Sequence, residues 1–189
     1  GWYGRLGHND KDNQYCPKMV DDGYLHPLVR AINCGSYNTC AITFEKDQKE
    51  PVGDLWIWGR RSVVCSPDDV MTPQHFQSID GEPKILAISC GDMHALAITV
   101  SGDVYGWGEN LSGQLGLGEK NRKAKIQPPS LMRSLPDQPE LMATGPYHTI
   151  AFLRNKEAYG WGNQSCGRLG LKQGAMGSLV PEKFVDMPA

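Results

Sequence analysis

Several features that mark common classes of protein are missing from this chain of 189 residues. It contains no run of about 18 apolar residues, so the sequence predicts no membrane-spanning helix. Its formal net charge is −2, whereas domains that bind nucleic acid are usually markedly basic. No segment shows a convincing helical period of apolar residues. We therefore expect a β-rich protein with no membrane span and no nucleic-acid partner.

The residue patterns that usually carry chemistry are also missing. There is no Ser/His/Asp order, no glycine-rich phosphate loop and no paired His/Cys ligand set. None of the six cysteines forms a Cys-x-x-Cys pair, and Cys34 and Cys90 occupy the same position of a sequence repeat. This phase indicates small buried side chains in a reducing compartment rather than a disulfide framework. The sequence therefore predicts no catalytic residue, no cofactor and no metal, and a protein that is not an enzyme.

What the chain does contain is a repeated unit. Trp-Gly occurs at Trp58-Gly59, Trp107-Gly108 and Trp161-Gly162, with spacings of 49 residues (58 to 107) and 54 residues (107 to 161). A second signature, Gly-x-Leu-Gly, stands at 4–7, 113–116 and 167–170. A period of about 50 residues is typical of small units that are stacked or arranged radially.

A third signature completes the unit. The segments 34–38, 90–94 and 144–148 each carry a glycine followed three residues later by Asn38, His94 or His148. An apolar stretch, a polar turn and Trp-Gly follow each of them, which is typical of antiparallel strands joined by tight turns. The strands expected from this pattern cover residues 29–32, 39–44, 55–58, 85–89, 94–100, 103–107, 129–135, 141–143, 149–153 and 158–161.

This order of motifs resembles the repeat of the regulator of chromosome condensation, most closely over residues 100–118. The resemblance covers essentially the whole chain and implies an all-β fold, a seven-bladed β-propeller with a four-stranded sheet in each blade. The chain holds about three and a half repeats, so we expect three to four blades of a partial propeller, cut from a larger protein at both ends. A genuine short open arc is the alternative. The expected repeats of this single domain, 1–189, are 1–59, 60–108, 109–162 and a partial 163–189.

An incomplete propeller would leave strand edges and apolar faces unpaired. We therefore expect the remaining blades, or another chain, to pack on the terminal blades. Within the repeat we interpret Trp58, Trp107 and Trp161 as packing residues between blades. Their glycines, Gly59, Gly108 and Gly162, end the strand at a sharp turn. A stacking platform for bases or sugars is the alternative for the tryptophans.

The histidines at matching positions, His94 and His148, invite a metal or catalytic interpretation. Asn38 stands at the same position of the first repeat, and a metal site would not be expected to accept that exchange. A hydrogen bond from the side chain to a neighbouring loop would accept it. We therefore interpret both histidines as structural residues, with a metal site as the alternative.

Three departures from the repeat are candidate binding surfaces or ordinary solvated loops. After Gly59 the chain continues with Arg60 and Arg61 instead of Gly-x-Leu-Gly. The first repeat has a long loop at 45–54, and a basic segment at 119–125 follows the Gly-x-Leu-Gly at 113–116. Loops of repeat proteins often carry binding residues, so both interpretations stay open.

Two functions fit these observations. The first is a non-catalytic scaffold for protein–protein interaction, a propeller module within a larger protein or assembly. The second, implied by the resemblance, is guanine-nucleotide exchange on a small GTPase, although no inserted hairpin wedge is evident and no basic tail supports chromatin binding. The resemblance also suggests an intracellular protein, cytoplasmic or ciliary and cytoskeletal, with the nucleus as an alternative. The candidate partner-binding residues are Ser36, Tyr37, Asp92, Met93, Pro146, Tyr147, Arg60 and Arg61.

Overall fold

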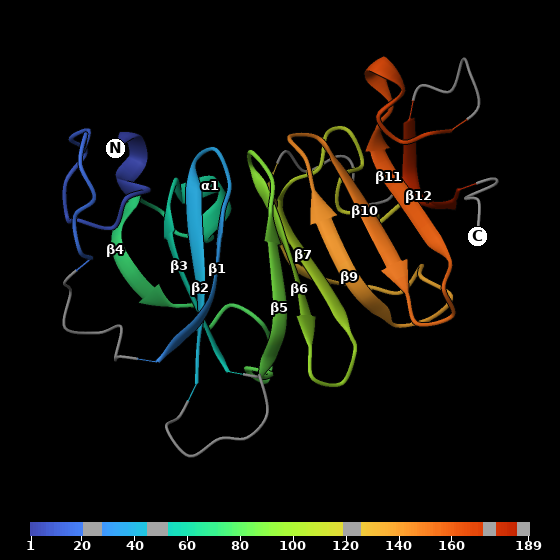
Figure 1. Ribbon diagram of the computed structural model, residues 1–189, viewed down its shortest axis with the longest axis horizontal. Helices are drawn as coiled ribbons and strands as arrows, with labels where there is room; N and C mark the ends of the chain where they lie inside the picture. The colour runs from blue at the N-terminus through green and yellow to red at the C-terminus, as the bar shows by residue number, and fades with distance from the viewer. Residues whose placement is uncertain (21–27, 45–52, 119–125, 172–176, 185–189) are drawn as a thin grey trace.

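Three four-stranded antiparallel sheets make up most of the protein (Figure 1). The computed structural model describes residues 1–20, 28–44, 53–118, 126–171 and 177–184. In each sheet the strands follow one another in chain order. The first sheet contains β1 (Val29–Cys34), β2 (Asn38–Thr43), β3 (Asp54–Gly59) and β4 (Val70–His75). The second contains β5 (Ile85–Cys90), β6 (His94–Thr99), β7 (Val104–Glu109) and β8 (Ile126–Met132). The third contains β9 (Pro139–Thr144), β10 (His148–Leu153), β11 (Ala158–Asn163) and β12 (Gly177–Lys183).

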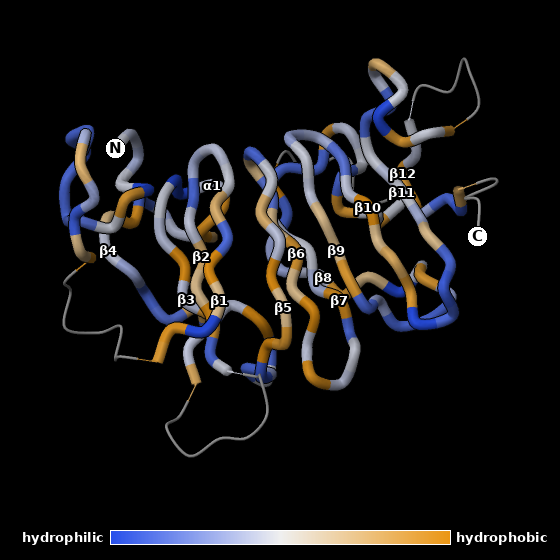
Figure 2. Tube along the Cα trace, in the orientation of Figure 1, coloured by the Kyte–Doolittle hydropathy of each residue, from blue (hydrophilic) through white to orange (hydrophobic). Residues whose placement is uncertain are grey.

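The sheets stand side by side in the manner of propeller blades (Figure 1). Their first strands lie next to one another, with β1 against β5 and β5 against β9. Figure 2 shows that apolar residues follow the strands, where neighbouring sheets face each other. The expected all-β fold and partial propeller are confirmed.

All ten strands expected from the sequence are present, but the pattern missed β4 and β12. It also missed three short helical turns: η1 (Trp2–Gly4), α1 (Arg61–Val64) and η3 (Ser165–Gly167). A single turn is too short to show a helical period. The expected repeats end at Trp-Gly, inside each sheet, because the fourth strand follows that motif.

The repeated tryptophans occupy the same place in all three sheets. Trp58, Trp107 and Trp161 pair with the residue that follows Asn38, His94 or His148. Their exposed fractions are 2%, 0% and 0%, so they are packing residues. The indole N–H of Trp107 donates to the carbonyl of Val63, and that of Trp161 to the carbonyl of Gln114, both at 2.9 Å.

These two hydrogen bonds connect neighbouring sheets. Gln114 belongs to the Gly-Gln-Leu-Gly turn of the second sheet, and its acceptor carbonyl binds a tryptophan of the third. Val63 lies in α1, where the first sheet lacks that signature. The short helix α1 therefore replaces Gly-x-Leu-Gly in sequence and supplies the same acceptor to the next sheet. The Trp58 indole nitrogen has no hydrogen-bond partner among the described residues.

Glycine is required directly after the tryptophan. Gly108 has a φ of 96°, in the left-handed region that favours glycine. A Cβ there would overlap the carbonyl oxygen of Met93, which accepts a hydrogen bond from the N–H of Glu109 at 2.8 Å. Gly162 meets the carbonyl of Tyr147 in the same way. The Trp-Gly motif thus holds the end of the third strand against the loop between the first two strands.

The second sheet is covered more completely than the third. Leu96 of β6 is 0% exposed and packs with Leu153 and Trp161 of the third sheet. The matching residue of β10 is Ile150, because each pairs with the glycine before Trp-Gly. Every residue of β6 is buried, whereas Ile150 and Phe152 are partly exposed. The third sheet therefore presents an apolar face that described residues cover only in part.

Candidate functional site

The loops that join the first and second strands of each sheet lie at one end of the molecule (Figure 1). They consist of residues 35–37, 91–93 and 145–147. The hydroxyl of Ser36 donates to the carboxylate of Asp92, which joins the first loop to the second. A Cβ at Gly91 would lie 2.6 Å from the carbonyl oxygen of Gly145. These loops form a continuous row, which we call the loop row.

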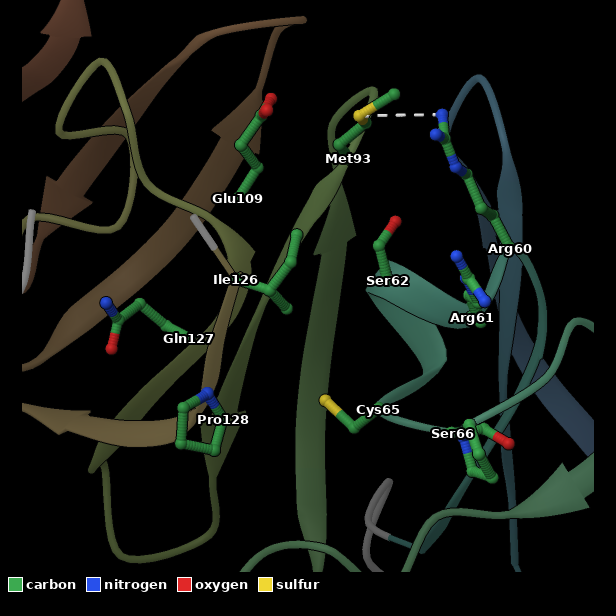
Figure 3. A pocket seen from close by; sticks show the side chains of 11 residues that line it. Arg60, Arg61, Ser62, Cys65, Ser66, Met93, Glu109, Ile126, Gln127 and Pro128 are labelled. Atoms are coloured by element: carbon green, nitrogen blue, oxygen red, sulfur yellow. Dashed lines mark hydrogen bonds between the residues drawn. The ribbon is translucent and has the colours of Figure 1, made fainter. Parts of the chain in front are cut away.

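Arg60 lies against the first loop and is held on several sides. Its guanidinium lies 4.9 Å from the ring centroid of Tyr3 and 5.4 Å from that of Tyr37. The two rings meet edge to face with their centroids 5.5 Å apart. Arg60 Nη1 lies 3.8 Å from the sulfur of Met93 in the second loop (Figure 3). Cation–π contacts of this kind attract a guanidinium to the aromatic rings.

The candidate residues from the sequence differ in how freely they face solvent. Pro146 and Tyr147 are exposed, with Tyr147 at 43%. Tyr37 and Met93 are half-buried because they pack against Arg60. The structure thus brings the first two loops together with Arg60, and leaves the third loop as the more accessible part of the row.

A cavity of about 610 Å³ lies beside the loop row, between the first and second sheets (Figure 3). Three residues of the candidate set line it: Arg60, Arg61 and Met93. Sequence reasoning missed most of its walls, although the absence of Gly-x-Leu-Gly after Gly59 was a signal of an altered connection. The lining residues that it missed are Ser62, Cys65, Ser66, Pro67, Glu109, Ile126, Gln127 and Pro128.

The ring of His94 is buried and lies over Gly91, where a Cβ would overlap it. Its Nε2 lies 3.5 Å from the Thr149 hydroxyl of the third sheet, and its Nδ1 has no partner in the described structure. Burial, with a smaller contribution from the nearby His148, lowers the pKa of His94 to about 3. A neutral imidazole that packs between two sheets explains the Gly-x-x-His pattern.

His148 occupies the matching position of the third sheet and is half-buried. Burial and the nearby positive charge of Arg168 lower its pKa. Over the described ranges no group of three or more His, Cys, Asp or Glu side chains is placed to hold a metal ion. Within the same ranges no helix has the length and apolarity of a membrane span.

Two expected features fall on residues that the structure does not describe. Residues 45–52 contain most of the long loop of the first repeat, and residues 119–125 are the basic segment. Both segments lie outside the described residues, and their interpretation as binding surfaces stays a prediction.

Comparison with known proteins agrees with the repeat pattern. Two models of the regulator of chromosome condensation (RCC1) repeat match the chain, one at residues 85–114 and 141–168 and the other at residues 101–152. The chain contains RCC1 repeats. Each sheet described above is therefore one blade of an RCC1-like propeller.

The curated relatives are longer than this chain. The ultraviolet-B receptor UVR8 of Arabidopsis thaliana is 32% identical over 185 residues, which are 97% of this chain and 40% of the receptor. The human E3 ubiquitin-protein ligase HERC2 is 30% identical over 175 residues, 90% of this chain and 3% of the ligase. The chain thus spans less than half the length of these relatives.

Solved structures show the same fold. Yeast RCC1 (Prp20), solved with Kap60, matches with a TM-score of 0.71 and 23% identity over 84% of this chain and 37% of Prp20. Human WBSCR16 matches with a TM-score of 0.75 and 16% identity over 96% of this chain and 44% of its own. At these identities the likeness concerns the propeller fold alone.

The low pKa of His94 predicts an acid-sensitive fold. Unfolding returns its pKa from about 3 to 6.5, so the unfolded chain binds the extra proton between these values. The contribution of neutral His94 to the free energy of unfolding is therefore fully present above pH 6.5. It is lost as pH falls from 6.5 towards 3, by up to about 1.4 kcal/mol per pH unit. His94→Asn, which copies Asn38 of the first sheet, should remove this component. Urea unfolding at pH 7 and pH 4.5 measures it.

In that comparison the wild-type chain should lose more stability than His94→Asn on acidification. Equal losses would show that His94 is not buried as a neutral imidazole. Zinc bound stoichiometrically to the wild-type chain and lost in His94→Asn would contradict the structural interpretation altogether.

Proposed function

We propose that this chain is a non-catalytic scaffold for protein–protein interaction, an RCC1-like propeller module that acts within a larger protein or assembly. The observation that carries the proposal is the loop row, in which exposed and half-buried residues of three sheets stand on a rigid β framework. Loops on such a framework commonly carry binding residues. Tyrosine and methionine, present at Tyr37, Tyr147 and Met93, are enriched in interface cores.

The relatives support an interaction role at this coarse level. RCC1 repeats occur in a photoreceptor and in E3 ligases such as HERC2, which are proteins of different function. Prp20p of Saccharomyces cerevisiae was described with its binding to Gsp1p and histones. We extend only the general role, binding of a protein partner, to this chain. We further propose an intracellular location, in the cytoplasm or with ciliary or cytoskeletal assemblies.

Tyr147→Ala tests the loop row with little risk to the fold, because Tyr147 is 43% exposed. Truncation of an interface anchor commonly costs about 2 kcal/mol or more. We expect the variant to bind a partner isolated with the wild-type chain at least about tenfold more weakly. Titration calorimetry measures the affinity, and the thermal midpoint should change little.

Tyr15→Ala is the matched control, because Tyr15 is 92% exposed and lies outside the loop row. It should bind the partner like the wild-type chain. Equal losses in both variants, or no loss in either, would place the binding surface elsewhere.

The third sheet supports a second part of the proposal, that a further sheet of the same kind packs on its open face. Ile150 and Phe152 are partly exposed there, whereas the equivalent face of β6 is fully buried. Apolar faces of this kind usually mark an interaction surface. Either the remaining blades or another chain would cover this face.

The chain of residues 1–189 should therefore self-associate, and light scattering measures its mass. Ile150→Lys should reduce the association by placing a charge on the open face. Val100→Lys is the control, since Val100 is 54% exposed in the turn after β6. A stable, monodisperse monomer of the unmodified chain would contradict this proposal.

Guanine-nucleotide exchange on a small GTPase is the second candidate function. One observation favours it: the partly exposed carboxylate of Asp92 lies in the middle of the loop row and is held there by Ser36. An exchange factor acts by binding the nucleotide-free GTPase more tightly than the loaded form. Against it, α1 and β4 directly follow Gly59 and Arg60, with no hairpin between them.

Release of labelled GDP from Gsp1p, measured by fluorescence, tests the alternative. A scaffold should leave the release rate unchanged. Acceleration that Asp92→Ala abolishes and Asp103→Ala preserves would overturn the scaffold proposal, because Asp103 is exposed in the turn between β6 and β7 at the other end of the sheet.

A further inference from the structure

The cavity beside the loop row has walls of two kinds. On one side lie Arg60 and α1, with Arg61 and Ser62 at the start of the helix. On the other side Met93, Ile126 and Pro128 supply apolar surface (Figure 3). A site that combines two guanidinium groups with an apolar wall suits a ligand that has both an anionic and an apolar group.

The positive charges on this wall are not neutralised within the described structure. Neither the Arg60 nor the Arg61 guanidinium forms an ion pair there. The carboxylate of Asp69 accepts a hydrogen bond from the backbone N–H of Arg61 at 3.1 Å. Its other oxygen pairs with Lys11 at 3.2 Å, so that carboxylate is already engaged. The exposed Asp68 lies near Asp69, on the side of the two arginines away from this cavity.

Side chains at this cavity are also partly positioned for binding in the absence of a ligand. Arg60 already packs against the rings of Tyr3 and Tyr37, which lowers the entropic cost of ordering its side chain. The Ser62 hydroxyl, at the same wall, has no hydrogen-bond partner in the described residues. Guanidinium groups bind carboxylates through paired, charge-assisted hydrogen bonds.

The opposite wall limits the charge that the ligand can carry. Glu109 lines the cavity on the side of β7, and its carboxylate would repel a second negative charge placed near it. A single carboxylate next to the arginines avoids this repulsion better than a doubly charged phosphate does. A nucleic-acid backbone, with a phosphate at every nucleotide, fits less well still.

We infer that this cavity binds an extended segment of a partner protein, with an acidic side chain at Arg60 and Arg61 and a neighbouring apolar side chain against Met93 and Ile126. The inference rests on the proposed scaffold function and gives its partner a chemical class. It also assigns a role to α1: the helix that replaces Gly-x-Leu-Gly brings Arg61 to the cavity.

The test is selection from a phage library of random peptides of about twelve residues on the immobilised chain. Peptides with Asp or Glu close to an apolar residue should be enriched. A labelled synthetic copy of the most enriched peptide should bind Arg61→Glu at least about tenfold more weakly than the wild-type chain. Arg61→Gln, which removes the charge without reversing it, should fall between them. Arg61 is exposed, so both variants should fold, and their thermal midpoints check this.

Arg154→Ala is the matched control, because Arg154 is an exposed arginine in the turn after β10. It should bind the peptide like the wild-type chain. No enrichment, enrichment without an acidic bias, or equal binding by Arg61→Glu would overturn the inference. Displacement of the peptide by millimolar inorganic phosphate would overturn it in favour of a simple anion site.

The outcomes also separate this inference from the proposed function. Enriched peptides that lose affinity with Tyr147→Ala but not with Arg61→Glu would bind the loop row. That result would overturn the assignment of the cavity and leave the scaffold proposal in place. Acceleration of GDP release by the chain would overturn the scaffold proposal whatever the cavity binds.

Discussion

The buried hydrogen bond from a tryptophan indole to the preceding sheet is the interaction on which the arrangement of sheets depends. Trp107 donates to Val63 and Trp161 to Gln114, each at 2.9 Å and with the ring 0% exposed. Burial of such a ring removes a large apolar area from water. An indole N–H left unpaired at that depth costs free energy, so, for the second and third sheets, the neighbouring turn is favoured where its carbonyl accepts this hydrogen bond.

The position of the loop row follows from this packing. The glycine after each tryptophan lies so close to the Gly-x-x-His loop that no side chain fits between them, as Gly108 shows against Met93. The next residue then donates its N–H to the same loop. A residue buried for packing thereby determines where the loops of the loop row stand. The same connection in the first sheet carries Arg60, which borders both the loop row and the cavity.

The sequence correctly predicted the features that recur in every repeat. Trp58, Trp107 and Trp161 recur with a period of about 50 residues, and matching motifs at a similar spacing imply matching places in similar sheets. The sequence did not predict the elements that depart from this period. The helix α1 is four residues long, too short to show helical periodicity, and β4 and β12 follow connections whose length differs between repeats.

The candidate site was predictable only in part for a related reason. The loop residues stand at fixed positions of the repeat, so their gathering on one side follows from the fold. The contact of Arg60 with Tyr3 joins the first sheet to the segment before β1, and no repeated motif links these two residues. The cavity likewise depends on how two sheets approach each other, which only tertiary packing decides.

The free energy of unfolding of Trp107→Phe, measured in urea, tests most directly whether the indole hydrogen bond joins the sheets. Phenylalanine keeps an aromatic ring but leaves the Val63 carbonyl without its donor, so we predict a loss of about 1–3 kcal/mol. Trp2→Phe is the control, because Trp2 is 65% exposed, and its stability should stay within about 0.5 kcal/mol of the wild type. If Trp107→Phe were no less stable than Trp2→Phe, the indole hydrogen bond would not be what holds the sheets in place.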